Sequence, residues 1–241
     1  MIIYGINPVV EALRAGRVRE IRIADRHDAR LQGVVDEATR LAVAIRRVPK
    51  ELLDKASASG VHQGVVAEVS ARADVTLAEL ADSGAGPPLI IVLDEVEDPQ
   101  NVGAILRSVD AAGASGLVRQ TRRSAALDGA AAKASAGAVH HVKIATVVNI
   151  ARALEELKAA GVWTVGLDAE GKMPYYEWDL TLPTALVVGA EGRGLRRLVR
   201  ERCDHVASIP MRGQVGSLNV SAAAAIVLFE AVRQRRSRGR P

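Results

Sequence analysis

The apolar positions of the first 70 residues follow two alternating periods, one typical of helices and one typical of strands. A three-to-four-residue period predicts a helix that enters at Asn7 and Pro8 and ends at Gly16, and a second helix over 29–41. Runs rich in valine and isoleucine predict strands at 20–24, 44–48 and 64–69. This half is therefore expected to be a small α/β domain.

From residue 87 the alternation of strands and helices becomes regular. The predicted strands are 88–94, 116–120, 141–147, 162–168, 184–191 and a short one from His205. The predicted helices are 101–112, an alanine-rich piece within 121–138, 149–161, 195–203 and a small-residue helix after Asn219. Crossover connections of this kind imply a parallel sheet covered on both faces, with ligands bound beyond the carboxyl ends of its strands.

A short stretch separates the two halves. Residues 71–86 contain SGAGPP, the glycine- and proline-rich composition of a linker. The expected organisation is a domain over 1–70, a linker over 71–86 and a second domain over 87–241.

Composition narrows the class of protein. A hydrophobic fraction of 49% and a charged fraction of 25% are ordinary for a globular protein. No apolar run approaches the ~18 residues that a membrane helix needs, so no membrane association is expected. The N-terminus lacks a secretory leader pattern, and the single cysteine, Cys203, fits a reducing compartment, so a cytoplasmic location is expected.

Charge is unevenly distributed. The formal net charge is +4, and five of the last nine residues are arginine: Arg233, Arg235, Arg236, Arg238 and Arg240. Such a tail either attracts phosphates or is a solvated chain end. With only six aromatic residues, a platform for stacking bases is hard to build. His140 and His141 are adjacent without further ligands nearby in sequence, so no metal site is expected.

Three loops carry the candidate chemistry. In the first, Asn101 opens a helix in which Gly103 and Arg107 lie on one side. Asn101 reads either as a cap or as a site residue. Arg107 lies on a face expected to be buried, where an arginine needs an anionic partner such as a phosphate, and Gly103 is expected to clear the space beneath it.

The second loop is VVGAEGRG, residues 187–194, which suits a nucleotide-like ligand held by backbone groups. Its glycine spacing is not the dinucleotide fingerprint, and Glu191 either orients a polar group or favours a helix N-terminus. In the third loop, Ile209, Leu218 and nearby backbone are expected to surround an apolar part of a ligand, and Asn219 reads as a cap or a contact.

Taken in order, three motifs resemble the SpoU/TrmH class of RNA ribose 2'-O-methyltransferases. They are N-x-G-x-x-x-R (Asn101, Gly103, Arg107), G-A-E-G-x-G (Gly189 to Gly194) and I-P-M followed by S-L-N-V-S (Ile209 to Met211, Ser217 to Ser221). The likeness covers essentially the whole chain, and YGINPVVEAL and VHQGVVAEV resemble the family's small ribosomal-protein-like (L30e/L7Ae-like) domain. It is greatest to members that methylate a guanosine of large-subunit (23S) ribosomal RNA.

The resemblance implies S-adenosylmethionine as methyl donor, a SPOUT-type C-terminal domain with a deep trefoil knot, and a homodimer. It implies donor binding at five residues: Gly189, Gly192, Ile209, Met211 and Leu218. It implies catalytic roles for five others: Arg107, Asn101, Glu191, Ser217 and Asn219. Because a guanidinium stays protonated, two roles for Arg107 stay open, a phosphate clamp or a base activated by the RNA.

Three alternatives are open at this point. The same chemistry could act on transfer RNA or another ribosomal site, with discrimination in residues 1–70. A non-enzymatic RNA-binding assembly factor could retain the fold. A dinucleotide oxidoreductase is disfavoured by the glycine spacing.

Overall fold

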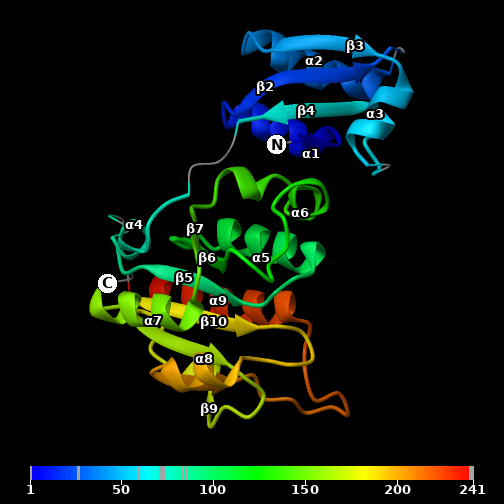
Figure 1. The fold of residues 1–241 in the computed structure, drawn as a ribbon. Coiled ribbons are helices and arrows are strands. Elements are labelled where there is room, and N and C mark those ends of the chain that lie inside the picture. Colours follow the sequence, from blue (N-terminus) through cyan, green and yellow to red (C-terminus); the bar gives the residue numbers. More distant parts are fainter. Residues whose placement is uncertain are drawn as a thin grey trace. The chain divides into compact units, whose positions relative to one another are not determined.

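The computed structural model describes residues 2–25, 28–58, 60–70, 74–82, 84 and 86–238. The chain forms two compact units, and Figure 1 shows their elements in sequence colours. The first unit takes the N-terminal 73 residues together with 102–107 and 126–141, and the second takes the remainder.

The first unit is built on a four-stranded sheet in the order β1-β4-β2-β3. Its strands are β1 (Ile2–Tyr4), β2 (Val18–Ala24), β3 (Ala44–Val48) and β4 (Val65–Val69). Strand β4 is antiparallel to β1 and β2, whereas β2 and β3 are parallel. Its helices are α1 (Ile6–Arg14), α2 (Ala29–Arg40), α3 (Lys50–Ala56) and α6 (Gly129–Ala134), with a 3-10 turn η1 (Ala138–His140). The predicted α/β elements are confirmed, but β1 and α3 were too short to predict from periodicity.

The second unit contains a seven-stranded sheet in the order β7-β6-β5-β10-β8-β11-β9, and all its pairs are parallel. Its strands are β5 (Leu89–Asp94), β6 (Gly116–Gln120), β7 (Ile144–Val147), β8 (Trp163–Leu167), β9 (Met173–Pro174), β10 (Thr184–Gly189) and β11 (His205–Ser208). Every residue of β5 and β10 is buried. The predicted parallel sheet with central strands buried on both faces is thus confirmed.

Helices cover both faces of this sheet. Helices α7 (Ile150–Ala159) and α8 (Arg197–Arg202) share one apolar core with alternate residues of β5 and β10. Helix α9 (Val220–Arg238) packs against β10 on the other side (Figure 1). In the predicted linker, α4 (Leu77–Ala81) buries Leu80 in the core shared with α7. The domain boundaries expected from the sequence stay a prediction.

Helix α5 (Pro99–Ala111) begins earlier than the sequence suggested. Asp98 is its N-cap, because its side chain accepts a hydrogen bond from the backbone N–H of Gln100 at 2.9 Å, and Pro99 takes the first helical position. The prediction that Asn101 opens the helix is therefore wrong, and its side chain is free for another role.

The arginine-rich end of α9 is partly built into the fold. The guanidinium of Arg235 donates hydrogen bonds to four backbone carbonyls, those of Leu180, Leu182, Pro87 and Pro88. As far as Arg235, this end is therefore not a frayed chain, whereas Arg240 lies outside the described residues, as does the side chain of Arg238. In the part of the chain that the structure describes, no helix is long and apolar enough to cross a membrane. The trefoil knot stays a prediction.

Candidate active site

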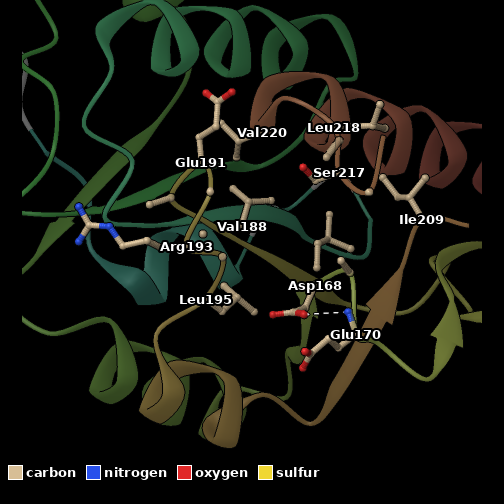
Figure 2. A pocket seen from close by; sticks show the side chains of 18 of the residues that line it. Asp168, Glu170, Val188, Glu191, Arg193, Leu195, Ile209, Ser217, Leu218 and Val220 are labelled. Carbon is tan, nitrogen blue, oxygen red and sulfur yellow. Dashed lines mark hydrogen bonds between the residues drawn. The ribbon is translucent and has the colours of Figure 1, made fainter. Parts of the chain in front are cut away.

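A cavity of about 440 Å³ lies beyond the carboxyl ends of β8, β10 and β11 in the second unit. Its volume is in the range of small-molecule and cofactor sites. It is lined by the 167–170 loop, the 188–195 loop, Arg200, Ile209, Met211 and the turn that leads into α9. Figure 2 shows Ile209, Ser217 and Leu218 on one side of this cavity and Asp168 with Glu170 at another end. The cavity thus lies where parallel sheets bind ligands.

All five residues expected to bind the donor line this cavity. They are Gly189, Gly192, Ile209, Met211 and Leu218. Glu191 and Ser217, expected in the reaction, line it as well. Residues separated by up to 29 positions in the sequence are therefore brought to one site by the sheet order.

The glycine loop after β10 is a tight turn whose backbone conformation favours glycine. Gly192 and Gly194 have φ values of 78° and 65°, in the left-handed region. The N–H of Gly194 donates to the carbonyl of Ala190 at 2.9 Å and closes the turn. A Cβ atom at Gly189 would collide with the backbone carbonyl of Gly194. The close approach packs the two ends of the loop against each other and fixes its shape beside the cavity.

A buried carboxylate anchors this loop to the neighbouring strand. Asp94, at the end of β5, accepts hydrogen bonds from the backbone N–H of Arg196 at 2.9 Å and from its Nε at 2.7 Å. The same guanidinium donates to Gln120 at 3.1 Å and pairs with Glu95 at 3.3 Å. A hydrogen bond from Arg123 lowers the pKa of Glu95. Loops that follow β5, β6 and β10 are therefore tied together by charge.

Three polar side chains from three distant segments meet at the rim of the cavity. The Asn101 side-chain amide donates to Glu191 Oε2 at 3.1 Å, and Asn101 Oδ1 accepts from Asn219 Nδ2 at 2.9 Å. Asn219 Oδ1 also accepts from the backbone N–H of Ser221 at 2.9 Å. Asn219 is thus a helix cap and a site contact at once. Glu191 does not act as a helix N-terminal acid, because α8 begins only at Arg197.

The structure contradicts the burial expected for Arg107 and the role expected for Gly103. Arg107 is exposed, so the prediction of a buried arginine that needs an internal anion is wrong. Gly103 does not clear space for it, because a Cβ there would lie 2.7 Å from the carbonyl oxygen of Ala131 in α6. Among the described residues, no hydrogen bond or ion pair holds the Arg107 guanidinium. It is available to an external anion.

The cavity fits S-adenosylmethionine by its own chemistry. The glycine-rich loop over Gly189–Gly194 lines the cavity and offers backbone polar groups to a ligand. Ile209, Met211 and Leu218 offer apolar contacts opposite them, and Asp168 and Glu170 offer carboxylates. An amphipathic ligand with hydroxyl and amine groups matches such a lining.

The parallel sheet, the glycine-loop cavity and the Asn–Glu–Asn contact are the features that the three motifs led us to expect, and comparisons with known proteins give the class. The model of the SpoU rRNA methylase family matches residues 88–229. The model described as RNA 2'-O ribose methyltransferase substrate binding matches residues 2–74. The chain belongs to the SpoU family of RNA methyltransferases, as its motifs predicted.

Individual relatives span nearly the whole chain. The 23S rRNA (guanosine-2'-O-)-methyltransferase RlmB of Pseudomonas syringae is 44% identical over 99% of this chain and 98% of its own. The crystal structure of the SpoU methyltransferase AviRb of Streptomyces viridochromogenes with the cofactor AdoMet is 30% identical, with a TM-score of 0.82 over 98% of this chain and 91% of that one. The TrmH/SpoU tRNA modifying enzyme of A. aeolicus is 33% identical and covers 68% of this chain and 82% of its own, with a TM-score of 0.58.

Sequence reasoning missed four residues of the site. Asp168 and Glu170 line the cavity, and Asp94 and Arg196 anchor its glycine loop. Asp94 and Arg196 are 102 positions apart, and nothing local signals their contact. Asp94 did carry one hint, a charge at the end of a wholly apolar strand, where a buried carboxylate requires a partner.

Proposed function

We propose that this protein transfers a methyl group from S-adenosylmethionine to the ribose 2'-hydroxyl of a guanosine in 23S ribosomal RNA, in the cytoplasm. The hydrogen-bonded group of Asn101, Glu191 and Asn219 at the rim of the donor-sized cavity carries this proposal. These residues come from the three motifs that the family shares. The full-length match to the Pseudomonas syringae enzyme supports the guanosine substrate.

The proposed donor site uses backbone more than side chains. Gly189 and Gly192 hold the polar part of the donor through main-chain groups, and Leu218, Ile209 and Met211 enclose its apolar part. When bound, S-adenosylmethionine supplies an electrophilic methyl group. The protein's contribution is alignment of the incoming hydroxyl, since an in-line displacement depends chiefly on geometry.

We assign the acceptor side to the polar group at the rim. Glu191 is fixed by Asn101 at 3.1 Å and by Asn219 at 3.5 Å, so its carboxylate is held to accept a hydrogen bond from the ribose. Ser217 lines the cavity beside Leu218 and orients the same sugar. The exposed Arg107 clamps a phosphate of the RNA, because its guanidinium stays charged and is a poor base.

A homodimer is part of this proposal. Helix α9 exposes the large apolar side chains of Ile226 and Phe229 on one face, together with Ala222. These positions recur at helical spacing and form a stripe of the kind that a second copy covers. Sedimentation equilibrium of wild type and Phe229→Glu tests it: the wild type should be a dimer and the variant a monomer. A wild type that stays monomeric at micromolar concentration refutes this part.

Mass mapping of ribose methylation in ribosomal RNA, with and without the protein, tests the main proposal. A single guanosine of 23S RNA should lose its 2'-O-methyl group in the absence of the protein. A methyl group lost from transfer RNA instead would favour the tRNA-acting relatives. Arg107→Ala should lower kcat/KM for RNA at least 100-fold, and full activity at limiting RNA would remove Arg107 from the mechanism.

A further inference from the structure

The aromatic residues of the chain are gathered at one edge of the second unit. Of the six, four lie there: Trp163, Tyr175, Tyr176 and Trp178. The Trp163 and Trp178 rings have centroids 5.8 Å apart, and the His205 ring lies 4.4 Å from Trp178. Trp163 and His205 begin β8 and β11, so this aromatic edge is at the amino ends of strands whose carboxyl ends line the donor cavity.

The rings are not enclosed by the protein. Trp163 is 44% exposed and Tyr176 is 50% exposed. Beside them is a hollow of about 370 Å³ lined by Tyr176, Glu177, Trp178, Asp179, Thr181, Arg233, Gln234 and Ser237. No aliphatic side chain is among these residues. The lining combines two aromatic rings with the guanidinium of Arg233 and the carboxylates of Glu177 and Asp179, and rings beside a guanidinium suit a planar polar ligand.

We propose that this hollow binds an unpaired base of the RNA substrate, at a second contact remote from the donor cavity. The proposal rests on RNA being the substrate. Tyr176 and Trp178 offer the ring surface on which a base stacks, and the exposed guanidinium of Arg233, paired with Glu230 at one side, faces the backbone.

Glu177 gives the hollow a base preference. Its carboxylate is exposed, and among the described residues no hydrogen bond or ion pair occupies it. A carboxylate accepts a hydrogen bond from an exocyclic amine, which cytosine has and uracil lacks. The hollow therefore prefers cytidine to uridine by about fivefold, which corresponds to about 1 kcal/mol.

Intrinsic fluorescence tests the proposal directly, because the chain has only two tryptophans and both belong to the aromatic edge. Titration of the full-length protein with a ten-nucleotide oligocytidylate should quench this fluorescence, and an oligouridylate should bind about fivefold more weakly. Raising the salt concentration should weaken binding only slightly, because at most two phosphates are neutralised.

The key variant is Tyr176→Ala, which should weaken oligocytidylate binding about 5- to 100-fold, as expected for loss of one stacked base. Tyr176→Phe should bind like the wild type. Leu198→Ala is the matched control, because Leu198 is 47% exposed but does not line the hollow. Glu177→Gln should remove the preference for cytidine without abolishing binding.

Two outcomes overturn the proposal. One is an oligonucleotide that binds, as seen by anisotropy of a labelled strand, without any change in tryptophan fluorescence. The other is a Tyr176→Ala protein that binds as before, or that becomes monomeric in sedimentation, which would assign the hollow to a second copy of the chain. If quenching is intact but no 23S guanosine loses its methyl group, the proposed function fails and the base site stands.

Discussion

Replacement of Asp94 by asparagine should loosen the donor loop while the chain stays folded. Asp94 is 0% exposed and accepts hydrogen bonds from two nitrogen atoms of Arg196, the backbone N at 2.9 Å and Nε at 2.7 Å. An asparagine in the same place keeps one acceptor oxygen but turns an NH2 group toward these donors. The change therefore removes a charge and creates a donor facing a donor.

The expected loss of stability depends on how far each of the two Arg196 donors is exposed to solvent. A hydrogen bond to a charged group contributes about 1.5–3 kcal/mol, but the Arg196 side chain is 42% exposed, so its share is reduced by solvent to about 1 kcal/mol or less. The buried contact with the backbone N–H keeps most of its value. The sum is about 2–3 kcal/mol of unfolding free energy.

Urea unfolding measures this loss of stability. Binding of S-adenosylmethionine, measured by calorimetry, should weaken about tenfold, because the loop that lines the cavity has lost its anchor. Asp110→Asn is the matched control: Asp110 is exposed at the end of α5, and its replacement should change stability by less than about 0.5 kcal/mol. If Asp94→Asn unfolds at the wild-type urea concentration and binds the donor normally, the anchoring role is wrong.

Three further predictions concern the loop, the cysteine and the C-terminal helix. Gly189→Ala should abolish donor binding in calorimetry because its Cβ collides with the Gly194 carbonyl, whereas Gly213→Ala, with open space around it, should bind normally. Burial raises the pKa of Cys203 to about 12, so a thiol reagent at pH 8 should react with it only after denaturation. The unfolded thiol has a pKa of about 8.5, so the free energy of unfolding should fall as the pH rises from that value toward the folded pKa. Rapid native labelling would contradict this. Arg235→Gln should lower the free energy of unfolding, measured in urea, by about 1–3 kcal/mol, because it loses hydrogen bonds to backbone carbonyls. The control is Arg236→Gln at the exposed neighbouring residue, which should leave stability unchanged. Equal effects of the two variants would show that Arg235 does not anchor α9.

Local rules predicted most elements of the fold and failed where two of them competed. In DPQN both Asp98 and Asn101 are good helix caps, and the proline between them decides the matter, since proline favours the first helical position and makes Asp98 the cap. Applied to the sequence, this rule would have indicated that Asn101 has a different role. The exposure of Arg107 could not be found in that way, because the apolar residues around it predict only which face of α5 is buried on average.

Contacts between residues on different strands could not be predicted, because they depend on the order of the strands in the sheet. The sheet order places β10 between β5 and β8, and β11 next to β8. That order brings Arg196 to Asp94 and His205 to Trp163, although no local pattern links either pair. The small number of aromatic residues suggested that a stacking platform would be hard to build, but the sheet order gathers four of the six at one edge.

Asn219 shows how two readings of one residue can hold together. Its Oδ1 accepts from the backbone N–H of Ser221 and from Ser221 Oγ, which fixes the orientation of the amide at the start of α9. With Oδ1 committed to the helix, Nδ2 must point the other way, where it meets Asn101 and Glu191. Capping therefore does not compete with the site contact but orients the amide for it. The small-residue helix and the reacting side of the cavity are joined through this one side chain, so a change at the start of α9 acts on Glu191 as well as on the donor.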